Sequence, residues 1–436
     1  MHNMLNYKTL NIGDLIKKGG LTFFSCLLAV IILPVHVDFL PPVMILWLIS
    51  WIVENHQGFR KIWSFKDPAV LLFVGFSLYF AWYVSGLLYT EDLPNGILLI
   101  FRRLSFIIFP FVLITPGELI KEKVKLLFRV FSLSALSYIL FSFGLAIFRS
   151  IYLINGSISF NPHPLEADYN NYFFGTDFAL IQHPTYLAMY VIFSICITIE
   201  AFFDKKLQSF LRIGWLLSGI VLLISLYFIS SRTGIISALI IIPIYLIIKF
   251  KRLNKWWISG LIALAAATLL TILFLNNERI KYYFPYNSVS SVMEKFMLDN
   301  RVPIWKSSIN VIKQNLVLGV GAGDASYELQ KEYLSEGYSE MYYNNLNAHD
   351  QYLEILLGTG LIGLLIFAWI ISYMVYIAIK RRNLIFGLFL LIVLIFFLFE
   401  SILNRIAGVT FFSLFSFLLL QMEDRSFNSV ESLHRT

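Results

Sequence analysis

The chain has 436 residues, of which 58% are hydrophobic and only 14% are charged, and its mean hydropathy is +0.74. This composition excludes a water-soluble enzyme fold and a disordered chain, because neither accommodates so much apolar surface. Forty-one Phe, 23 Tyr and 9 Trp suit lipid-facing helices and interfacial belts. Cys26 and Cys196 lie in apolar runs, which excludes a disulfide framework and a cysteine-rich metal site. The composition therefore predicts a polytopic membrane protein.

Twelve apolar runs follow one another along the chain, each suited to a hydrocarbon core that takes about 20 helical residues to cross. The predicted spans are 21–36, 39–53, 69–89, 96–115, 125–148, 185–203, 212–230, 233–249, 256–275, 351–379, 384–400 and 406–421. The first run is followed by Pro34, His36 and Asp38 and not by a small-residue cleavage pattern, so we expect it to be a retained span. The expected fold is all-α, with about twelve transmembrane helices.

Most of the 34 basic residues fall on one side of this predicted topology. They occur within 8–18, 60–66, 121–129, 205–212, 249–255, 380–382 and 425–435. Short turns on the other side carry almost none besides Arg232 and Arg405. Because basic loops stay in the cytoplasm, both chain termini are predicted to be cytoplasmic. The net charge of +7 then reflects topology, and we expect no nucleic-acid partner.

Two segments on the outer side are long, namely 149–184 and 276–350. The predicted organisation is nine helices within 1–275, with 149–184 as a loop between two of them, then the large loop 276–350, three helices within 351–421 and a cytoplasmic tail at 422–436. In the large loop, apolar residues recur at helical spacing after Pro303. These residues are Trp305, Ile309, Ile312 and Leu316. They predict an amphipathic helix on the membrane surface.

Ionisable residues at the mouths of spans are costly and are the first candidates for function. Arg102 and Arg103 lie about one third of the way into the fourth span. Arg232 lies at the outer junction of the seventh and eighth spans, where it also suits a snorkelling interfacial residue. Arg405 opens the last span, where pairing with Glu400 is an equal alternative to ligand contact.

Four further candidates belong to the outer loops and their junctions with the membrane. Arg301 precedes the amphipathic segment, where it can equally face water. His349 and Asp350 stand where the large loop re-enters the membrane, and His183 occupies the equivalent junction after the first long loop. Histidine at such a junction also suits a plain interfacial role.

The predicted topology brings the five arginines and both histidines to one outer-facing level. Clustered arginines suit a diphosphate, because guanidinium groups make bidentate, permanently charged contacts to phosphate oxygens. A neutral imidazole beside them can take a proton from an attacking hydroxyl. Asp350, Glu354 and Glu400 are too scattered to predict a magnesium site, so we expect no metal and no cofactor. The glycine-rich stretch 319–323 lacks the Lys-Ser/Thr ending of a phosphate loop and is predicted to be a turn.

At these residues the chain resembles the superfamily of O-antigen ligases and polymerases, which are bacterial integral-membrane glycosyltransferases. His349 and Asp350, nine residues, Gly360, two residues and Gly363 resemble the ligase signature, although that pattern usually has Asn, Ser or Gln in place of the aspartate. The segment 301–306 followed by 319–323 is similar to the large periplasmic loop of the family. The turn 231–234 resembles its arginine turn.

This resemblance implies a GT-C-like, metal-independent enzyme in the bacterial inner membrane. Its donor would be a glycan on undecaprenyl pyrophosphate, taken from the periplasmic side between membrane lipids. His349 would be the catalytic base. The substrate-binding residues would be Arg232, Arg301, Arg103, Arg102, Arg405, His183 and Asp350. The aspartate would either orient the imidazolium of His349 or bind solvent.

Three functions stay open at this level. A ligase would use a lipid A core sugar as acceptor, and a polymerase would extend another carrier-linked glycan; the His349 signature favours the ligase. A flippase or other transporter of lipid-linked oligosaccharides is compatible with twelve spans and cytoplasmic termini. The concentration of ionisable groups on one face and the 75-residue outer loop argue against transport.

Overall fold

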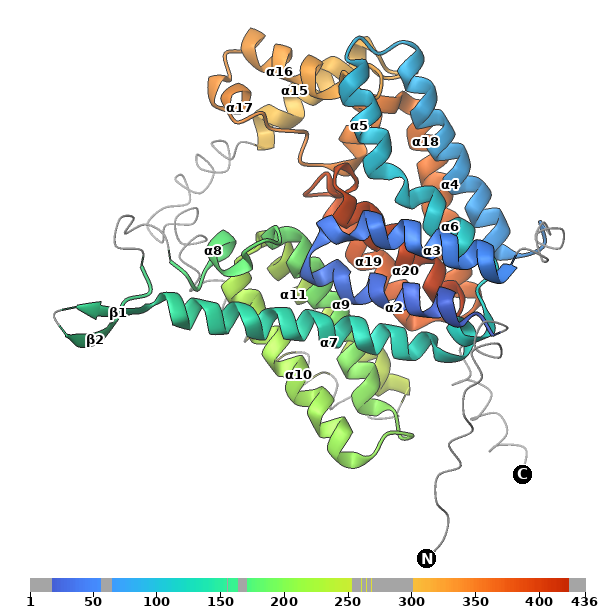
Figure 1. Cartoon of the computed structure of the whole chain (residues 1–436). Helices are drawn as coiled ribbons and strands as arrows, with labels where there is room; N and C mark the ends of the chain where they lie inside the picture. The colour runs from blue at the N-terminus through green and yellow to red at the C-terminus, as the bar shows by residue number, and fades with distance from the viewer. Residues whose placement is uncertain are drawn as a thin grey trace, which may run out of the picture.

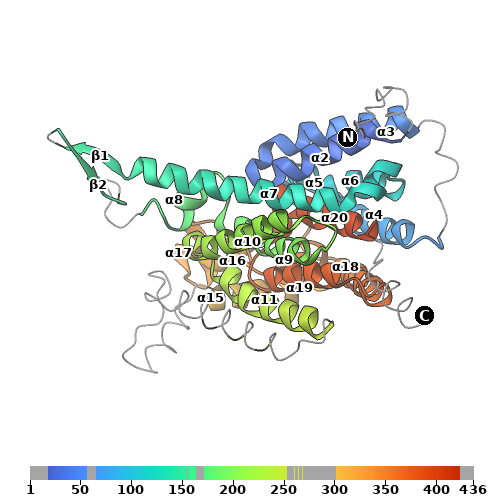
Figure 2. The ribbon, with the colours of Figure 1, turned by 90° about the horizontal axis from the view of Figure 1, so that it is seen from below.

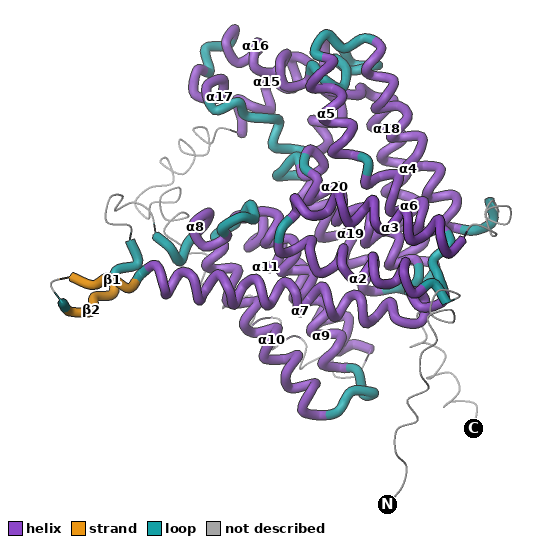
Figure 3. Tube along the Cα trace, in the orientation of Figure 1, coloured by secondary structure: helices purple, strands orange, loops and turns teal. Residues whose placement is uncertain are grey.

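The computed structural model describes residues 18–55, 65–154, 156–163, 171–252 and 301–422, with three isolated positions between 260 and 268. These residues form a helical bundle with one small hairpin (Figures 1 and 3). The helices are α2 (Gly20–Val35), α3 (Leu40–Asn55), α4 (Pro68–Ser85), α5 (Leu93–Arg103), α6 (Ser105–Ile114), α7 (Glu118–Arg149), α8 (Gly175–Ala179), α9 (Pro184–Phe203), α10 (Ser209–Ile229), α11 (Arg232–Arg252), α15 (Arg301–Gln314), α16 (Ala325–Ser335), α17 (Ser339–Tyr343), α18 (Gln351–Lys380), α19 (Leu384–Phe397) and α20 (Ile406–Leu420). Short 3-10 helices are η1 (Val37–Phe39), η3 (Gly86–Leu88) and η4 (Ile402–Asn404).

The prediction of a polytopic, mainly helical membrane protein is confirmed. Within the described residues, eight helices are long and apolar enough to cross a membrane, and α2, α19 and α20 are shorter apolar helices. The fourth predicted span is divided at Leu104 into α5 and α6. The predicted span 256–275 lies outside the described residues.

The two ends of the bundle differ in what they carry. We call "loop end" the end with α8, α15–α17 and the first turn of α18, which lies toward the upper left of Figure 1. We call "turn end" the opposite end, with the turns between α9 and α10 and between α18 and α19. Seen from below, α7 runs across the bundle between the α2–α3 pair and the α9–α10 pair (Figure 2).

A β-hairpin in the segment 149–184 departs from the all-α expectation. Strands β1 (Ile151–Ile154) and β2 (Ser157–Phe160) pair antiparallel at the end of α7. Gly156, in the turn, has a φ of +77°. The sequence signal was present, since Asn-Gly at 155–156 between β-branched and aromatic residues is typical of a two-residue hairpin turn.

The core lies around α9, α19 and α20. Every residue of α20 from Ala407 to Leu420 is buried. The Phe415 ring lies 4.7 Å from that of Phe131 and 5.1 Å from those of Phe193 and Phe411, measured between centroids. Aromatic pairs at this spacing add to the packing of buried apolar surface. The abundance of Phe therefore serves the interior as well as the lipid-facing surface.

Helices α19 and α20 are short, with 14 and 15 residues. At 1.5 Å per residue they span only about 21–23 Å, less than a hydrocarbon core of about 30 Å. The connection 398–405 between them buries Ser401, Ile402 and Leu403, whereas Leu398 and Arg405 at its two ends are exposed. Buried irregular backbone needs hydrogen-bond partners within the protein.

The predicted helix of the large loop is present as α15, although only part of its apolar series is buried within the protein. Its inward side chains are Ile304, Ser307, Ser308, Val311 and Ile312, whereas Ile309 is exposed and Leu316 lies beyond the helix end. The reason is that α15 packs against α16 and the start of α18, so neighbouring helices determine its buried face.

Candidate functional site

The connection 398–405 is tied to the first turn of α18 by side-chain hydrogen bonds. The Leu403 N–H donates to Gln351 Oε1 over 2.7 Å. The Ser401 hydroxyl donates to Glu354 Oε2 over 3.2 Å. Gln351 thus gives this irregular backbone a hydrogen-bond partner within the protein, and Glu354 does the same for the Ser401 side chain. The connection is thereby fixed beside the residues that precede α18.

His349 is one of those preceding residues, and its imidazole lies against Glu400. The distance between His349 Nδ1 and Glu400 Oε2 is 3.3 Å. His349 has a φ of +45°, a left-handed conformation that is unfavourable for a residue with a Cβ. Its backbone N–H donates to Asn347 Oδ1 over 3.0 Å, which holds this turn. Unfavourable backbone geometry held by neighbours is frequent at functional sites.

Three basic groups surround the Glu400 carboxylate. Burial raises the pKa of Glu400, but the hydrogen bond with His349 and the electrostatic interactions with His349, His183 and Arg301 outweigh it, so the pKa lies below its usual range. The Arg301 guanidinium also donates to the Phe399 carbonyl over 3.4 Å and lies over the Phe399 ring, 5.3 Å from its centroid. His349, His183 and Arg301 are thus brought together around one carboxylate, from three separate segments.

Arg103 is buried beneath this cluster, with 4% of its surface exposed. Its guanidinium donates to the Tyr83 hydroxyl over 2.5 Å and to Asn404 Oδ1 over 2.7 Å. It also lies over the Tyr83 ring, 4.0 Å from the centroid. Arg103, which lies on α5, therefore links the connection 398–405 to α4 through hydrogen bonds to both. Arg102, the preceding residue, is half-buried.

The arginine turn at 231–234 places Arg232 at the start of α11, where its side chain is half-buried. Ser231 Oγ accepts from the Gly234 N–H over 3.2 Å and so caps the helix. A Cβ on Gly234 would lie 2.5 Å from the Cβ of Ala188, so only glycine allows this approach between α11 and α9. The start of α11 therefore lies beside the first turns of α9, which follow His183.

His183 and Arg405 begin the two helices that flank the connection. His183 is exposed, and its Nδ1 accepts from the Thr185 N–H over 3.3 Å at the start of α9. Arg405 is exposed at the start of α20. The alternative pairing of Arg405 with Glu400 is wrong for the described structure, in which the Glu400 carboxylate contacts His349 instead.

Asp350 caps a helix, whereas its position next to His349 had suggested that it orients the imidazolium or binds solvent. Its Oδ1 accepts from the Leu353 N–H over 2.8 Å, which makes it the N-cap of α18. Burial raises the pKa of its carboxyl above the ordinary value. The imidazole of His349 instead contacts Glu400, which lies 51 residues away in the sequence. The sequence had suggested Glu400 only as a partner of Arg405 or as one of several scattered carboxylates.

The glycines of the His349 motif have a structural explanation. Helix α18 breaks at Gly360, where φ is +64° and a Cβ would lie 2.3 Å from the Val317 carbonyl oxygen. The break leaves the Leu357 carbonyl to accept from the Val320 N–H over 2.8 Å. The stretch 319–323 is thus a turn, as predicted, and it docks into the break. This contact fixes α15 and α16 relative to α18.

Within the described residues, no group of three or more His, Cys, Asp or Glu side chains is arranged to hold a metal ion. The three carboxylates nearest His349 have partners within the protein: Asp350 caps a helix, Glu354 accepts from Ser401, and Glu400 contacts His349. The arrangement instead combines one imidazole and carboxylate pair with several guanidinium groups.

Residues 217–368 match a protein family described as "O-Antigen ligase". This range contains Arg232, Arg301, His349 and Asp350, and it confirms the resemblance to the O-antigen ligase superfamily. A curated protein of Haemophilus influenzae, described as "Uncharacterized protein", is 26% identical over 200 residues, which are 44% of this chain and 49% of that protein. The match thus covers about half the length of that relative.

Proposed function

We propose that this membrane protein is an O-antigen ligase-like glycosyltransferase. It would move a glycan from undecaprenyl pyrophosphate to a sugar of the lipid A core, at the periplasmic face of the bacterial inner membrane. In this proposal both chain termini are cytoplasmic, the loop end faces the periplasm, and the reaction uses neither a metal nor a cofactor. The match over residues 217–368 supports the family, and the site supports the chemistry.

The observation that carries the proposal is the contact between His349 and Glu400, 3.3 Å apart. If Nδ1 carries a hydrogen toward the carboxylate, the lone pair of Nε2 is available to accept a proton. The acceptor hydroxyl oxygen forms a bond to the anomeric carbon while its proton passes to Nε2. The carboxylate then stabilises the imidazolium, as a buried acid does in other imidazole bases.

The leaving group in this reaction is the carrier pyrophosphate. The bond between the anomeric carbon and the pyrophosphate oxygen breaks, and its electron pair stays on that oxygen. Arg301 and Arg232, with Arg102 and Arg405 at the same end, would stabilise this charge through bidentate contacts. His183 would add a further contact to pyrophosphate or glycan. Arg103, bonded to Tyr83 and Asn404, would position the connection and not the substrate.

The apolar helices around the site support a lipid-linked donor. The connection 398–405 joins the apolar helices α19 and α20, so a pyrophosphate beside it would keep its polyprenyl chain among the helices. A water-soluble nucleotide sugar would not need such apolar surroundings. The same geometry is compatible with a polymerase, whose acceptor is another carrier-linked glycan. The ligase and the polymerase therefore differ only in the acceptor.

The test is a transfer assay with purified protein, a glycan on undecaprenyl pyrophosphate and EDTA, with and without lipid A core. We expect transfer to the core in the presence of EDTA and none with His349→Ala. Growth of a ladder without the core would identify a polymerase. An intact donor in both tubes, with folded protein, would contradict glycosyl transfer and revive the transporter alternative. Transfer that occurs without EDTA but stops when EDTA is added would contradict the metal-independent reaction.

A further inference from the structure

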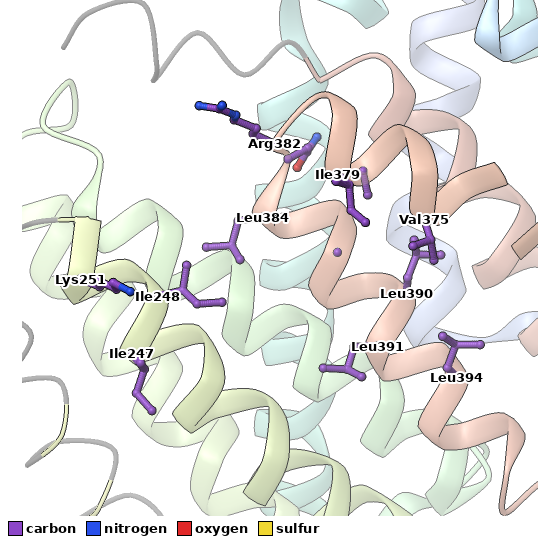
Figure 4. A pocket seen from close by; sticks show the side chains of 13 residues that line it. Ile247, Ile248, Lys251, Val375, Ile379, Arg382, Leu384, Leu390, Leu391 and Leu394 are labelled. Atoms are coloured by element: carbon purple, nitrogen blue, oxygen red, sulfur yellow. The ribbon is translucent and has the colours of Figure 1, made fainter. Parts of the chain in front are cut away.

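A cavity of about 1050 Å³ lies at the turn end, away from the candidate site. Its floor is α19, which packs against both α11 and α18, and these two helices form its walls. The lining side chains include Ile248, Val375 and Leu391 (Figure 4). Arg232 begins α11 and Lys251 lies in the last turn of the same helix, about 28 Å away along its axis. The cavity is therefore separate from the proposed pyrophosphate site.

The charges around this cavity are all of one sign. Lys251 and Arg382 line it, and none of the described residues in its lining is acidic. Lys251 lies in the last turn of α11 and Arg382 follows the end of α18, whereas Val375, Leu391 and Leu394 lie deeper along their helices. In Figure 4 both basic side chains lie on one side of the cavity. The cavity thus has a cationic mouth and an apolar interior.

The turn that carries Arg382 is built rigidly. Arg382 has a φ of +50°, a conformation that glycine adopts at much lower cost. Its neighbours hold the turn: the Arg381 guanidinium donates to the Leu420 carbonyl over 2.5 Å, and Asn383 Oδ1 accepts from the Phe386 N–H over 3.0 Å. The left-handed conformation of Arg382 belongs to the C-terminal cap of α18, in which the Asn383 N–H donates to the Ala378 carbonyl over 3.0 Å.

Other basic residues near this end do not line the cavity. Lys249 forms an ion pair with Glu200 over 2.5 Å. Lys380 lies 5.3 Å from the centroid of the Tyr376 ring. The cavity is distinguished from the general basic surface because two basic residues, Lys251 and Arg382, belong to its lining.

From this charge complementarity, we propose that the cavity binds an anionic glycerophospholipid. The phosphate headgroup contacts Lys251 and Arg382, and the acyl chains lie over α19 between α11 and α18. Basic pockets between helices at a membrane boundary recognise anionic headgroups in this way. The bound lipid would bridge α11 to the turn between α18 and α19. A zwitterionic phospholipid fills the same apolar space but gains less from the two cations.

The test is native mass spectrometry of the full-length protein with phosphatidylglycerol or phosphatidylethanolamine of identical acyl chains. We expect the wild-type protein to retain phosphatidylglycerol preferentially. The double variant Lys251→Gln/Arg382→Gln should bind it roughly thirty-fold more weakly, since each cation near a headgroup contributes about one kilocalorie per mole. Lys380→Gln, which removes a basic residue of the same end outside the cavity, should bind as the wild type does.

A second variant tests the location and not the charge. A Cβ on Gly387, which lines the cavity, would meet no atom within 4 Å, so Gly387→Trp fills the space without a backbone clash. It should reduce the binding of both lipids. Equal retention of the two lipids by the wild type, or unchanged binding in Gly387→Trp, would overturn the proposal. Loss of glycan transfer in these variants is not required, so failure of the proposed enzyme activity is distinguishable from failure of this lipid site.

Discussion

His349 Nδ1 lies 3.3 Å from Glu400 Oε2, although 51 residues separate the two in the chain. The contact joins the turn before α18 to the connection between α19 and α20. It gives the imidazole of His349 a defined partner, the Glu400 carboxylate. The predictions below test this pair and the groups around it.

Replacement of His349 by alanine should lower glycan transfer by roughly 10²–10⁴-fold, the usual contribution of a general base. Insertion and thermal stability should change little, because the imidazole is partly exposed. The measurement is initial transfer rate together with the melting temperature in nanodiscs. His163→Ala, which removes a histidine after the hairpin, is the control. Transfer near the wild-type rate would rule His349 out as the base.

Glu400→Gln should lower transfer by less than His349→Ala, because the base remains but its imidazolium loses a carboxylate. The rate should respond to pH differently from the wild type, since a charged partner of the imidazole is replaced by a neutral one. A pH–rate profile of both proteins provides the measurement. Superimposable profiles would show that Glu400 acts only in packing.

The same variant tests the lowered pKa of Glu400 through stability. Because the folded-state pKa lies below the ordinary value, the carboxylate stabilises the fold above that ordinary value, and this stabilisation is lost as pH falls through the folded-state pKa. The difference in melting temperature between wild type and Glu400→Gln should therefore narrow as pH falls from about 5 to about 3. A constant difference over this interval would contradict the lowered pKa.

Arg232→Lys should reduce transfer by at least about tenfold although the charge is kept, because an ammonium group cannot make the bidentate contact of a guanidinium. Arg149→Lys, at the same end but over the Tyr172 ring, is the matched control and should leave transfer unchanged. The comparison uses saturating and limiting donor concentrations. Full activity of Arg232→Lys would favour a snorkelling interfacial residue.

Arg103→Ala should lower the free energy of unfolding by at least about 2 kcal/mol, since it removes two charge-assisted hydrogen bonds in a buried environment. Arg102→Ala should leave the melting temperature nearly unchanged and lower transfer. Thermal melts and transfer rates of the two variants separate the structural arginine from the binding one. Loss of stability in Arg102→Ala, with loss of transfer but normal stability in Arg103→Ala, would make Arg102 the structural arginine and Arg103 the binding one.

Asp350→Ala should destabilise the start of α18 by about 0.5–2 kcal/mol, the usual value of an N-cap. Asp350→Asn should retain most of that stability, because asparagine caps equally well. Transfer by the asparagine variant should be close to that of the wild type. A large loss of transfer with normal stability would return Asp350 to the substrate-binding residues.

Sequence alone determined the helices of the bundle, since a chain in lipid must satisfy its backbone within each apolar segment. It also indicated His349, Arg232 and Arg301, because ionisable groups at a membrane boundary are costly and stand out. The hairpin at 151–160 was missed although its turn signal was present, because the surrounding apolar segments dominated the interpretation.

The partners of these residues were decided by tertiary structure. Arg103 and Asn404 are 301 residues apart, and whether an arginine in a span contacts substrate or protein depends on what the fold brings beside it. Asp350 became a helix cap because α18 begins immediately after it. Glu400 became the partner of His349 because hydrogen bonds hold the connection 398–405 against the first turn of α18. Hydropathy fixes which segments enter the membrane, but side-chain pairing depends on helix packing and depth, which no local pattern encodes.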